Sequence, residues 1–282
     1  MVSDAVLWLD GRLVPENEAR VSPFDHGLLV GDGVFETLRV YGGVPFAWTR
    51  HHQRLVRSAA GLGLTAPGSD ELRTAVDAVL EANRLTEGRV RLTITGGPSP
   101  LGSERGDGPP TVIVVVAPAK PWPPSVDVVI VPWTRNERGA VAGLKTISYA
   151  ENVRALAYAH EHGAGEAIFL NTADELCEAT GSNLFVVQDG VVRTPPTDAG
   201  CLLGVTRALV LELCAEHGLA AEEVALAPAA LGDADEAFLT SSTREVHPIR
   251  RVDRSALPAA PGPATDKIAG LFAALVARDT DP

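Results

Sequence analysis

The spacing of apolar residues divides the chain into segments of two kinds. Residues 34–41 alternate apolar and polar side chains, and the β-branched runs at 90–95 and 111–117 are equally typical of strands. In residues 51–63 the apolar positions fall three or four apart, which predicts an amphipathic helix, and residues 70–83 predict a second one. The first part of the chain is therefore expected to mix strands with helices.

Turn dipeptides indicate where some of these strands pair. Asp10-Gly11 separates the apolar residues 5–9 from 12–14, and Gly42-Gly43 follows the strand at 34–41, so both positions predict hairpins.

Glycine is concentrated in two other places. Gly31 and Gly33 lie on either side of Asp32, where they fit either a close approach of backbone to a neighbouring group or a β-bulge. Residues 96–110 hold five glycines and four prolines, which predicts a flexible loop with a functional role.

A proline-rich segment at 118–125 can sustain neither a helix nor a central strand, because proline lacks an N–H and fixes φ. We place a linker there, between a small N-terminal α/β domain (1–117) and a larger C-terminal domain (126–282). In the second domain the expected strands are 126–131, 166–170, 175–178, 183–187, 191–193 and 237–240, and the expected helices are 150–162 and 204–216.

Composition narrows the function classes. The chain of 282 residues has 36 acidic and 24 basic residues, a formal charge of −12, and no basic cluster, which argues against nucleic acid as a partner. No apolar run reaches the roughly 18 residues of a membrane span. The N-terminus lacks a basic segment and carries Asp4 and Asp10, so an export signal is not expected. The three cysteines have no paired spacing, which predicts reduced thiols, no metal site and a cytoplasmic protein.

Lys145 is the candidate for covalent chemistry. It ends a glycine-containing loop, lies between the apolar residues Leu144 and Ile147, and precedes an alanine-rich helical segment. An amine that is partly removed from water there becomes a usable nucleophile. The alternative is a lysine whose stem covers apolar surface while its charge stays in water.

Three features of the second domain bear on this lysine. Gly204, Val205 and Thr206 open a predicted helix, whose N-terminal N–H groups suit a phosphate. The hydroxyls of residues 241–243 follow a predicted strand and could complete the same anion site, although such clusters also form ordinary turns. Glu178 stands between apolar strands, where a carboxylate needs a partner such as a protonated ring nitrogen. An amine nucleophile, a phosphate site and a carboxylate together are what a pyridoxal phosphate site requires.

The order of these motifs resembles that of the class IV pyridoxal phosphate enzymes, which have fold type IV, over residues 5 to about 255. The matching segments are Gly31-Asp32-Gly33-Val34-Phe35-Glu36, His52-Gln53-Arg54-Leu55, the Lys145 loop, Glu178 before Ser182-Asn183-Leu184-Phe185, Gly204-Val205-Thr206-Arg207 and Ser241-Ser242-Thr243-Arg244-Glu245-Val246. The resemblance implies an α/β (α+β) fold with a barrel-like sheet in the larger domain, and a homodimer in which loops of one subunit cover the site of the other.

The resemblance also implies roles for particular residues. Lys145 would form a Schiff base with pyridoxal 5'-phosphate and then act as general base, and Glu178 would face the pyridine nitrogen. Arg54, Val205, Thr206 and Ser242 would hold the phosphate, and the other cofactor-binding residues would be Ser182, Asn183, Gly204 and Ser241. The candidate residues for the small-molecule amine substrate are Phe35, Arg91, Tyr149 and Thr243. Arg91 could meet a substrate carboxylate in a lyase or in an aminotransferase, and the alternative is a surface charge at a strand edge. No metal is implied.

Within this family the Lys145 loop and the opening around Asp32 resemble most closely sequences of 4-amino-4-deoxychorismate lyase, which eliminates pyruvate to leave 4-aminobenzoate for folate biosynthesis. The alternative is a branched-chain or D-amino-acid aminotransferase. Glu36 favours the aminotransferases, because some lyases have threonine there. The D-amino-acid enzymes have an arginine for the substrate carboxylate at a position that falls near Gly96 in this chain, and the branched-chain enzymes have a tyrosine at a position that falls at Ala150. These differences argue against both aminotransferase activities. A protein that only binds a phosphorylated metabolite is the non-enzymatic alternative.

Overall fold

The computed structural model describes residues 5–282, which form two compact units. Unit 1 consists of residues up to Lys120, of Leu144–Ser148 and of Thr280–Pro282. Unit 2 consists of Pro121–Gly143 and Tyr149–Asp279. The division falls within the proline-rich segment of residues 118–125, but the short segment that carries Lys145 groups with unit 1.

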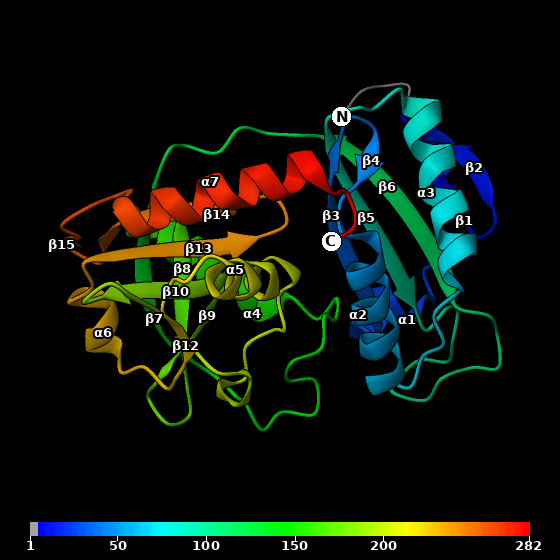
Figure 1. Cartoon of the computed structure of the whole chain (residues 1–282). Coiled ribbons are helices and arrows are strands. Elements are labelled where there is room, and N and C mark those ends of the chain that lie inside the picture. The colour runs from blue at the N-terminus through cyan, green and yellow to red at the C-terminus, as the bar shows by residue number, and fades with distance from the viewer. Residues whose placement is uncertain (1–4) are drawn as a thin grey trace. The chain divides into compact units, whose positions relative to one another are not determined.

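Unit 1 is built on a six-stranded sheet with the order β2-β1-β6-β5-β3-β4 (Figure 1). Every strand pair in it is antiparallel. The predicted hairpin around Asp10-Gly11 and the predicted strands of this half are confirmed. The strands are β1 (Val6–Leu9), β2 (Arg12–Pro15), β3 (Gly33–Tyr41), β4 (Val44–Pro45), β5 (Gly88–Thr95) and β6 (Thr111–Pro118).

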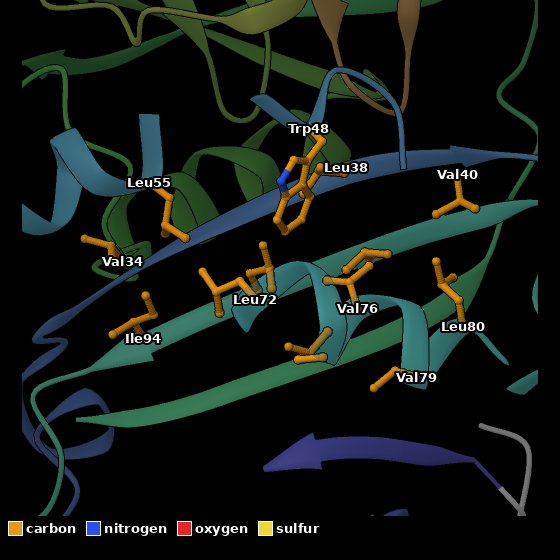
Figure 2. Close-up of a cluster of buried hydrophobic side chains, with 14 of the residues drawn as sticks. Val34, Leu38, Val40, Trp48, Leu55, Leu72, Val76, Val79, Leu80 and Ile94 are labelled. Atoms are coloured by element: carbon orange, nitrogen blue, oxygen red, sulfur yellow. The ribbon is translucent and has the colours of Figure 1, made fainter. Parts of the chain in front are cut away.

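Two long helices pack against this sheet. They are α2 (Trp48–Gly61) and α3 (Ser69–Asn83), both expected from their apolar spacing, and the structure adds the short helices η1 (Glu16–Glu18) and α1 (His26–Val30). Figure 2 shows the core between them, where Val34, Leu38 and Val40 of β3 meet residues such as Leu55 and Leu72 of the helices. Alternation along β3 thus directs one set of side chains into the core.

The segment 144–148 pairs with the edge of β3. The N–H of Phe35 donates to the carbonyl of Lys145 at 3.0 Å, and the N–H of Ile147 donates to that of Gly33 at 2.9 Å. A Cβ at Gly33 would lie 2.9 Å from Ile147 Cδ1, and one at Gly31 would lie 2.8 Å from Ser148 Oγ. Close packing thus explains Gly33, whereas Gly31 also has a positive φ of 71° as the C-cap of α1; the register of β3 with β5 continues without a bulge. This pairing explains why the segment groups with unit 1 and not with the predicted C-terminal domain.

Unit 2 contains a nine-stranded sheet in the order β12-β11-β10-β13-β14-β7-β8-β9, with β15 paired to β14. The sheet curls as a half-barrel, so that β9 also contacts β10. All predicted strands of this half are present. The strands are β7 (Val126–Arg135), β8 (Glu166–Asn171), β9 (Leu176–Ala179), β10 (Asn183–Gln188), β11 (Val191–Thr194), β12 (Ala221–Glu223), β13 (Glu236–Ser241), β14 (Glu245–Val252) and β15 (Ser255–Ala256).

Strand β7 is longer than its predicted range because it continues past an irregularity. Its register with β8 shifts between Ile130 and Thr134, and Pro132, which has no N–H for the ladder, lies inside that interval.

The helices of unit 2 cover different parts of its sheet. Helix α4 packs on β7 and β8 through small residues such as Ala155 and Ala159, while α5 and α7 pack against each other and on β13 and β14 (Figure 1). The inside of the curled sheet is filled by apolar side chains, among them Leu184 and Leu239. The helices are α4 (Ala150–Glu161), η2 (Thr197–Ala199), α5 (Val205–Glu216), α6 (Pro228–Gly232) and α7 (Pro263–Arg278).

Candidate active site

The lysine proposed for covalent chemistry is half-buried and tied to two elements of unit 1. Its N–H donates to Ser58 Oγ of α2 at 3.1 Å, and its carbonyl accepts from Phe35 of β3. Its Nζ lies 4.4 Å from the centroid of the Phe35 ring, which is only 5% exposed. The backbone of Lys145 is thus fixed at both polar groups, and its amine lies against an apolar surface.

Arg91 contacts the same aromatic ring. Its Cζ lies 3.8 Å from the Phe35 ring centroid, and its Nε donates to Thr93 Oγ1 at 3.3 Å. Arg91 and Thr93 point to one face of β5, and Phe35 is the partner of Thr93 in the neighbouring strand. The structure therefore brings together three predicted residues, Phe35, Arg91 and Lys145.

Arg54, the predicted phosphate ligand of unit 1, is buried in a network of charges. Its Nε and Nη2 donate to the two carboxylate oxygens of Glu36, each at 2.7 Å, and His51 Nδ1 lies 2.7 Å from Glu36 Oε2. Glu36 is fully buried. A bidentate pair of this kind fixes the plane of the guanidinium.

The same network shifts two pKa values. Burial by itself would raise the pKa of Glu36, but the charges and hydrogen bonds of Arg54 and His51 outweigh it and hold that pKa well below its usual range. Burial lowers the pKa of His51, and the positive charges of Arg54 and Lys145 act in the same direction, against the opposing effect of Glu36. Glu36 is thus ionised at neutral pH and His51 is neutral.

Glu178, on β9 of unit 2, is half-buried, with 15% of its side chain exposed. Its Oε2 accepts from the N–H of Leu202 at 2.9 Å, and its Oε1 lies 3.9 Å from Arg135 Nε. Arg135 also stacks on Phe169, with Cζ 4.3 Å from the ring centroid. The carboxylate thus has a backbone N–H and a guanidinium as its neighbours.

The loop that leads into α5 is close to this carboxylate. Asn183 Nδ2 donates to the carbonyl of Leu202 at 2.8 Å, and a Cβ on Gly204 would overlap Asn183 Oδ1, so only glycine fits there. Gly204 is the N-cap of the twelve-residue helix α5, and no side chain among the described residues caps it. The first N–H groups, those of Val205 and Thr206, are thus arranged as in helix N-termini that bind anions.

The remaining predicted residues lie in two turns and at one helix end of unit 2. Ser182 is buried, and its Oγ finds no hydrogen-bond partner within residues 5–282. Ser241 Oγ accepts from the N–H of Arg244 at 3.2 Å, and Ser242 and Thr243 follow it, half-buried. Tyr149 is the N-cap of α4 and half-buried. A buried hydroxyl that lacks a partner fits a polar group of a bound ligand.

Glu36, His51 and Arg135 were not among the predicted site residues. The signal for Glu36 was present, because it occupies the apolar phase of an alternating strand, between Val34 and Leu38. His51 lies one helical turn before Arg54, on the same face of α2. Arg135 carried no local signal.

The other candidate chemistries find no support in the described part of the chain. No group of three or more His, Cys, Asp or Glu side chains there has the arrangement of a metal site. Cys177, Cys201 and Cys214 are free and buried, and burial raises the pKa of the Cys201 thiol to about 12. No helix within residues 5–282 is long and apolar enough to cross a bilayer.

These groups define a class of protein. A lysine against an aromatic ring, a buried arginine, and a half-barrel sheet that carries a carboxylate beside an uncapped helix N-terminus are the features of a fold type IV pyridoxal phosphate enzyme. The unpartnered Ser182 hydroxyl and the uncapped α5 fit the polar groups of that cofactor.

Comparison with known proteins supports the same class. The family model described as amino-transferase class IV matches residues 33–252, and the chain belongs to that family. It is 36% identical over 254 residues to a protein of Methanocaldococcus jannaschii named as a branched-chain-amino-acid aminotransferase, with 88% of each chain covered. It is 34% identical to the D-alanine aminotransferase of Bacillus licheniformis (92% and 93% covered) and 33% identical to the aminodeoxychorismate lyase of Bacillus subtilis (95% and 93% covered).

Solved structures show the same fold. The branched-chain aminotransferase of Thermoproteus uzoniensis superimposes with a TM-score of 0.90 at 31% identity, with 96% of this chain and 94% of that chain covered. The chain is therefore a pyridoxal phosphate-dependent class IV enzyme with fold type IV, as its motifs predicted. Membership of an enzyme family also removes the alternative of a protein that only binds a phosphorylated metabolite.

Proposed function

We propose that this chain is an aminotransferase that moves the amino group of an α-amino acid to a 2-oxo acid. The observation that supports this most directly is that Lys145 Nζ and the Arg91 guanidinium contact one aromatic ring, at 4.4 and 3.8 Å from its centroid. In an α-amino acid the carboxylate is attached to the carbon that bears the amine, so an amine-handling lysine and a carboxylate-binding arginine must be neighbours.

Each residue has a role in this proposal. Pyridoxal phosphate, when bound, withdraws electrons from the carbon that bears the substrate amine. Lys145 would hold the cofactor through Nζ and then carry the proton between the α-carbon and the cofactor. Arg91, beside Phe35, would orient the substrate carboxylate, and Glu178, ionised beside Arg135, would keep the ring nitrogen protonated.

The phosphate would be held by charge and by N–H groups. The buried Arg54 would contribute its guanidinium, whose plane is fixed by Glu36. The α5 N-terminus would contribute the N–H groups of Val205 and Thr206. Hydroxyls would complete the site, from Ser182 with Asn183 and from Ser241 and Ser242. Tyr149 and Thr243 remain candidates for substrate contact.

Aminodeoxychorismate lyase is the second candidate, and it was the first choice from the sequence. Its support is the 33% identity to the Bacillus subtilis enzyme over 95% of this chain and the Lys145 loop motif. Glu36 no longer argues against it, because Glu36 orients Arg54 and so reports nothing about the substrate. In this reaction Lys145 would act as the acid that assists loss of the enolpyruvyl group as pyruvate.

One pair of assays separates these activities. The purified enzyme is given L- or D-amino acids with 2-oxoglutarate, and separately aminodeoxychorismate. Formation of glutamate and the pyridoxamine spectrum supports the aminotransferase. Release of pyruvate from aminodeoxychorismate without amino transfer overturns it in favour of the lyase. Borohydride reduction and peptide mapping should place a pyridoxyl group on Lys145, and Lys145→Ala should lack both that group and the absorption band of the bound cofactor.

We also propose a homodimer, which the family resemblance implies. Unit 1 exposes large apolar side chains on α1 and on the glycine- and proline-rich loop, with Leu28 70% and Leu101 74% exposed, beside Phe24 at 54%. The loop adjoins the segment before α1, because the N–H of Ser99 donates to the Phe24 carbonyl at 3.0 Å, and adjoining exposed apolar groups are typical of association surfaces. Light scattering after size exclusion should give twice the mass of one chain. The double variant Leu28→Asp, Leu101→Asp should give the mass of a single chain.

A further inference from the structure

A buried ion pair that the proposed reaction does not use lies in unit 2, between two turns that carry proposed cofactor ligands. Glu166, at the start of β8, and Arg244, in the turn before β14, are 4% and 6% exposed. Arg244 Nη2 donates to Glu166 Oε2 at 3.0 Å. The two residues are 78 positions apart in the chain, so the pair joins separate elements.

The glutamate end of the pair holds the first turn. Glu166 Oε1 accepts from the hydroxyl and, at 3.4 Å, from the N–H of Thr180. Thr180 lies in the turn between β9 and β10, closed by the Ala179 N–H, which donates to the Ser182 carbonyl at 2.8 Å. Ser182, with its unpartnered hydroxyl, is thus two residues from a backbone position fixed by Glu166.

The arginine end holds the second turn. The Arg244 N–H donates to Ser241 Oγ, and its guanidinium lies 3.8 Å from the Trp122 ring centroid. Trp122 in turn donates from Nε1 to the carbonyl of Thr243 at 2.8 Å. The backbone of residues 241–244, which includes the proposed phosphate ligand Ser242, is therefore held on both sides of Ser242.

A third contact fixes the arginine itself. Arg244 Nη1 lies 2.9 Å from His247 Nδ1, and His247 Nε2 lies 2.8 Å from the carbonyl of Pro123. The imidazole satisfies both contacts when it is neutral, with Nε2 donating and Nδ1 accepting. Burial, together with the charge of Arg244, lowers the pKa of His247 and favours this neutral form.

Stability alone does not explain such an arrangement. Replacing a buried ion pair by apolar residues of similar volume is often neutral or stabilising, because the two charges must be desolvated. A planar guanidinium can donate in several fixed directions at once, which an apolar group cannot. The pair therefore fits a requirement for precise placement of the two turns.

We propose that Glu166 and Arg244 are positioning residues, which hold the turns at 179–183 and 241–244 in the arrangement that binds the phosphate of the cofactor. Trp122 supports them by covering Arg244 and fixing Thr243. This proposal rests on the proposed cofactor role of these turns, and it assigns no contact between the pair and the substrate.

The test compares two aldehydes that differ only in the phosphate. The full-length protein is freed of cofactor and titrated with pyridoxal 5'-phosphate and with pyridoxal, and binding is followed by the absorption band of the aldehyde bound to Lys145. Arg244→Met and Glu166→Gln should each weaken binding of the phosphorylated aldehyde about tenfold or more, which is about 1.4 kcal/mol. Binding of pyridoxal should change less than about threefold. The loss in the double variant should be smaller than the two single losses combined, because both substitutions remove the contact between Arg244 and Glu166.

Two further variants keep the test decisive. Trp122→Phe changes a side chain that is 44% exposed, so the fold should persist, and it should weaken only the phosphorylated aldehyde, by about threefold. Arg250→Met is the matched control, because Arg250 lies on β14, the strand that follows Arg244, and its side chain pairs with Asp127 while being 65% exposed. It should bind both aldehydes as the unmodified chain does.

An equal loss for both aldehydes, or no loss for either, would overturn the positioning role. Failure of the proposed cofactor site is recognised separately, because the unmodified chain would then bind neither aldehyde at Lys145.

Discussion

Replacement of Glu36 by glutamine tests whether Arg54, the arginine proposed to bind the cofactor phosphate, is held by charge. Glu36 is completely buried and accepts hydrogen bonds of 2.7 Å from Arg54 Nε, from Arg54 Nη2 and from His51 Nδ1. Glutamine has nearly the same shape, so Glu36→Gln removes the charge without leaving a cavity. Its amide N–H₂ would also face the N–H groups of Arg54, so that two hydrogen-bond donors would point at each other.

The expected loss of stability is large. A buried charge whose partner is removed costs about 3–5 kcal/mol, because the remaining ion has lost its compensation in a medium of low polarity. The matched control is Asp77→Asn on α3, whose partner Arg73 is four residues away and whose side chain is 53% exposed. A surface pair of this kind contributes about 0–1 kcal/mol.

Urea unfolding of the cofactor-free chain, followed by circular dichroism and by tryptophan fluorescence, measures the difference. Both probes are needed because two compact units need not unfold in one transition. Glu36→Gln should lower the free energy of unfolding by at least about 3 kcal/mol and should also weaken cofactor binding. A loss no larger than that of Asp77→Asn would refute the conclusion that the charge network holds Arg54.

The pH dependence of this difference has a definite sign. The folded-state pKa of Glu36 lies well below the usual 4.5, so its contribution is complete above about pH 4.5 and is lost as the pH falls toward the folded-state pKa. The stability gap between the unmodified chain and Glu36→Gln should therefore be constant above about pH 6.5, where His51 is neutral in both states, and the part that Glu36 contributes should be lost below pH 4.5. Burial lowers the pKa of His51 from 6.5, so protonation of the unfolded state destabilises both proteins as the pH falls below about 6.5.

Three smaller perturbations test other parts of the structure. Asp281 accepts from the first turn of α2, which has no cap of its own, so Asp281→Ala should cost about 1 kcal/mol in urea unfolding while Asp281→Asn costs less. Arg105 holds the loop 96–110 to Asp32 through two hydrogen bonds of 2.6 and 2.7 Å. Arg105→Ala should therefore speed cleavage of that loop by subtilisin, and an unchanged cleavage rate would contradict this role of Arg105. Gly204→Ala should force Asn183 away and weaken pyridoxal phosphate binding about tenfold, measured by titration of the cofactor-free protein.

Strong periodicity made most of this fold predictable. The core positions of β3, α2 and α3 repeat every two, three or four residues, and all three elements form close to their expected limits. Helix α7 was not predicted, although Pro263 in its first turn and the spacing of Ile268, Phe272 and Leu275 are typical helix signals. Strand β14 has a weaker sequence signal, because Pro248 and two arginines interrupt its alternation of apolar and polar residues.

The positions of some proposed site residues were predictable from local signals, but their arrangement was not. A lysine at the end of a glycine-containing loop and a glycine before a helix are such signals; in the structure Lys145 is half-buried and Gly204 is the N-cap of α5. The sequence assigned Lys145 to the second domain, because nothing local shows that its loop pairs with β3.

The charged residues that orient the proposed ligands belong to a third category. Glu36 and Arg54 are 18 positions apart, and Glu166 and Arg244 are 78 apart, so no window of sequence contains either pair with its context. Each pair is buried, and each adjoins a residue proposed to bind the cofactor phosphate. Because apolar replacements can leave stability unchanged while losing the direction of every donor, selection for folding alone would not retain both pairs. A variant that folds normally but has lost one pair should therefore first lose affinity for the cofactor phosphate. Such a result would show that the pair serves the binding site and not the stability of the fold.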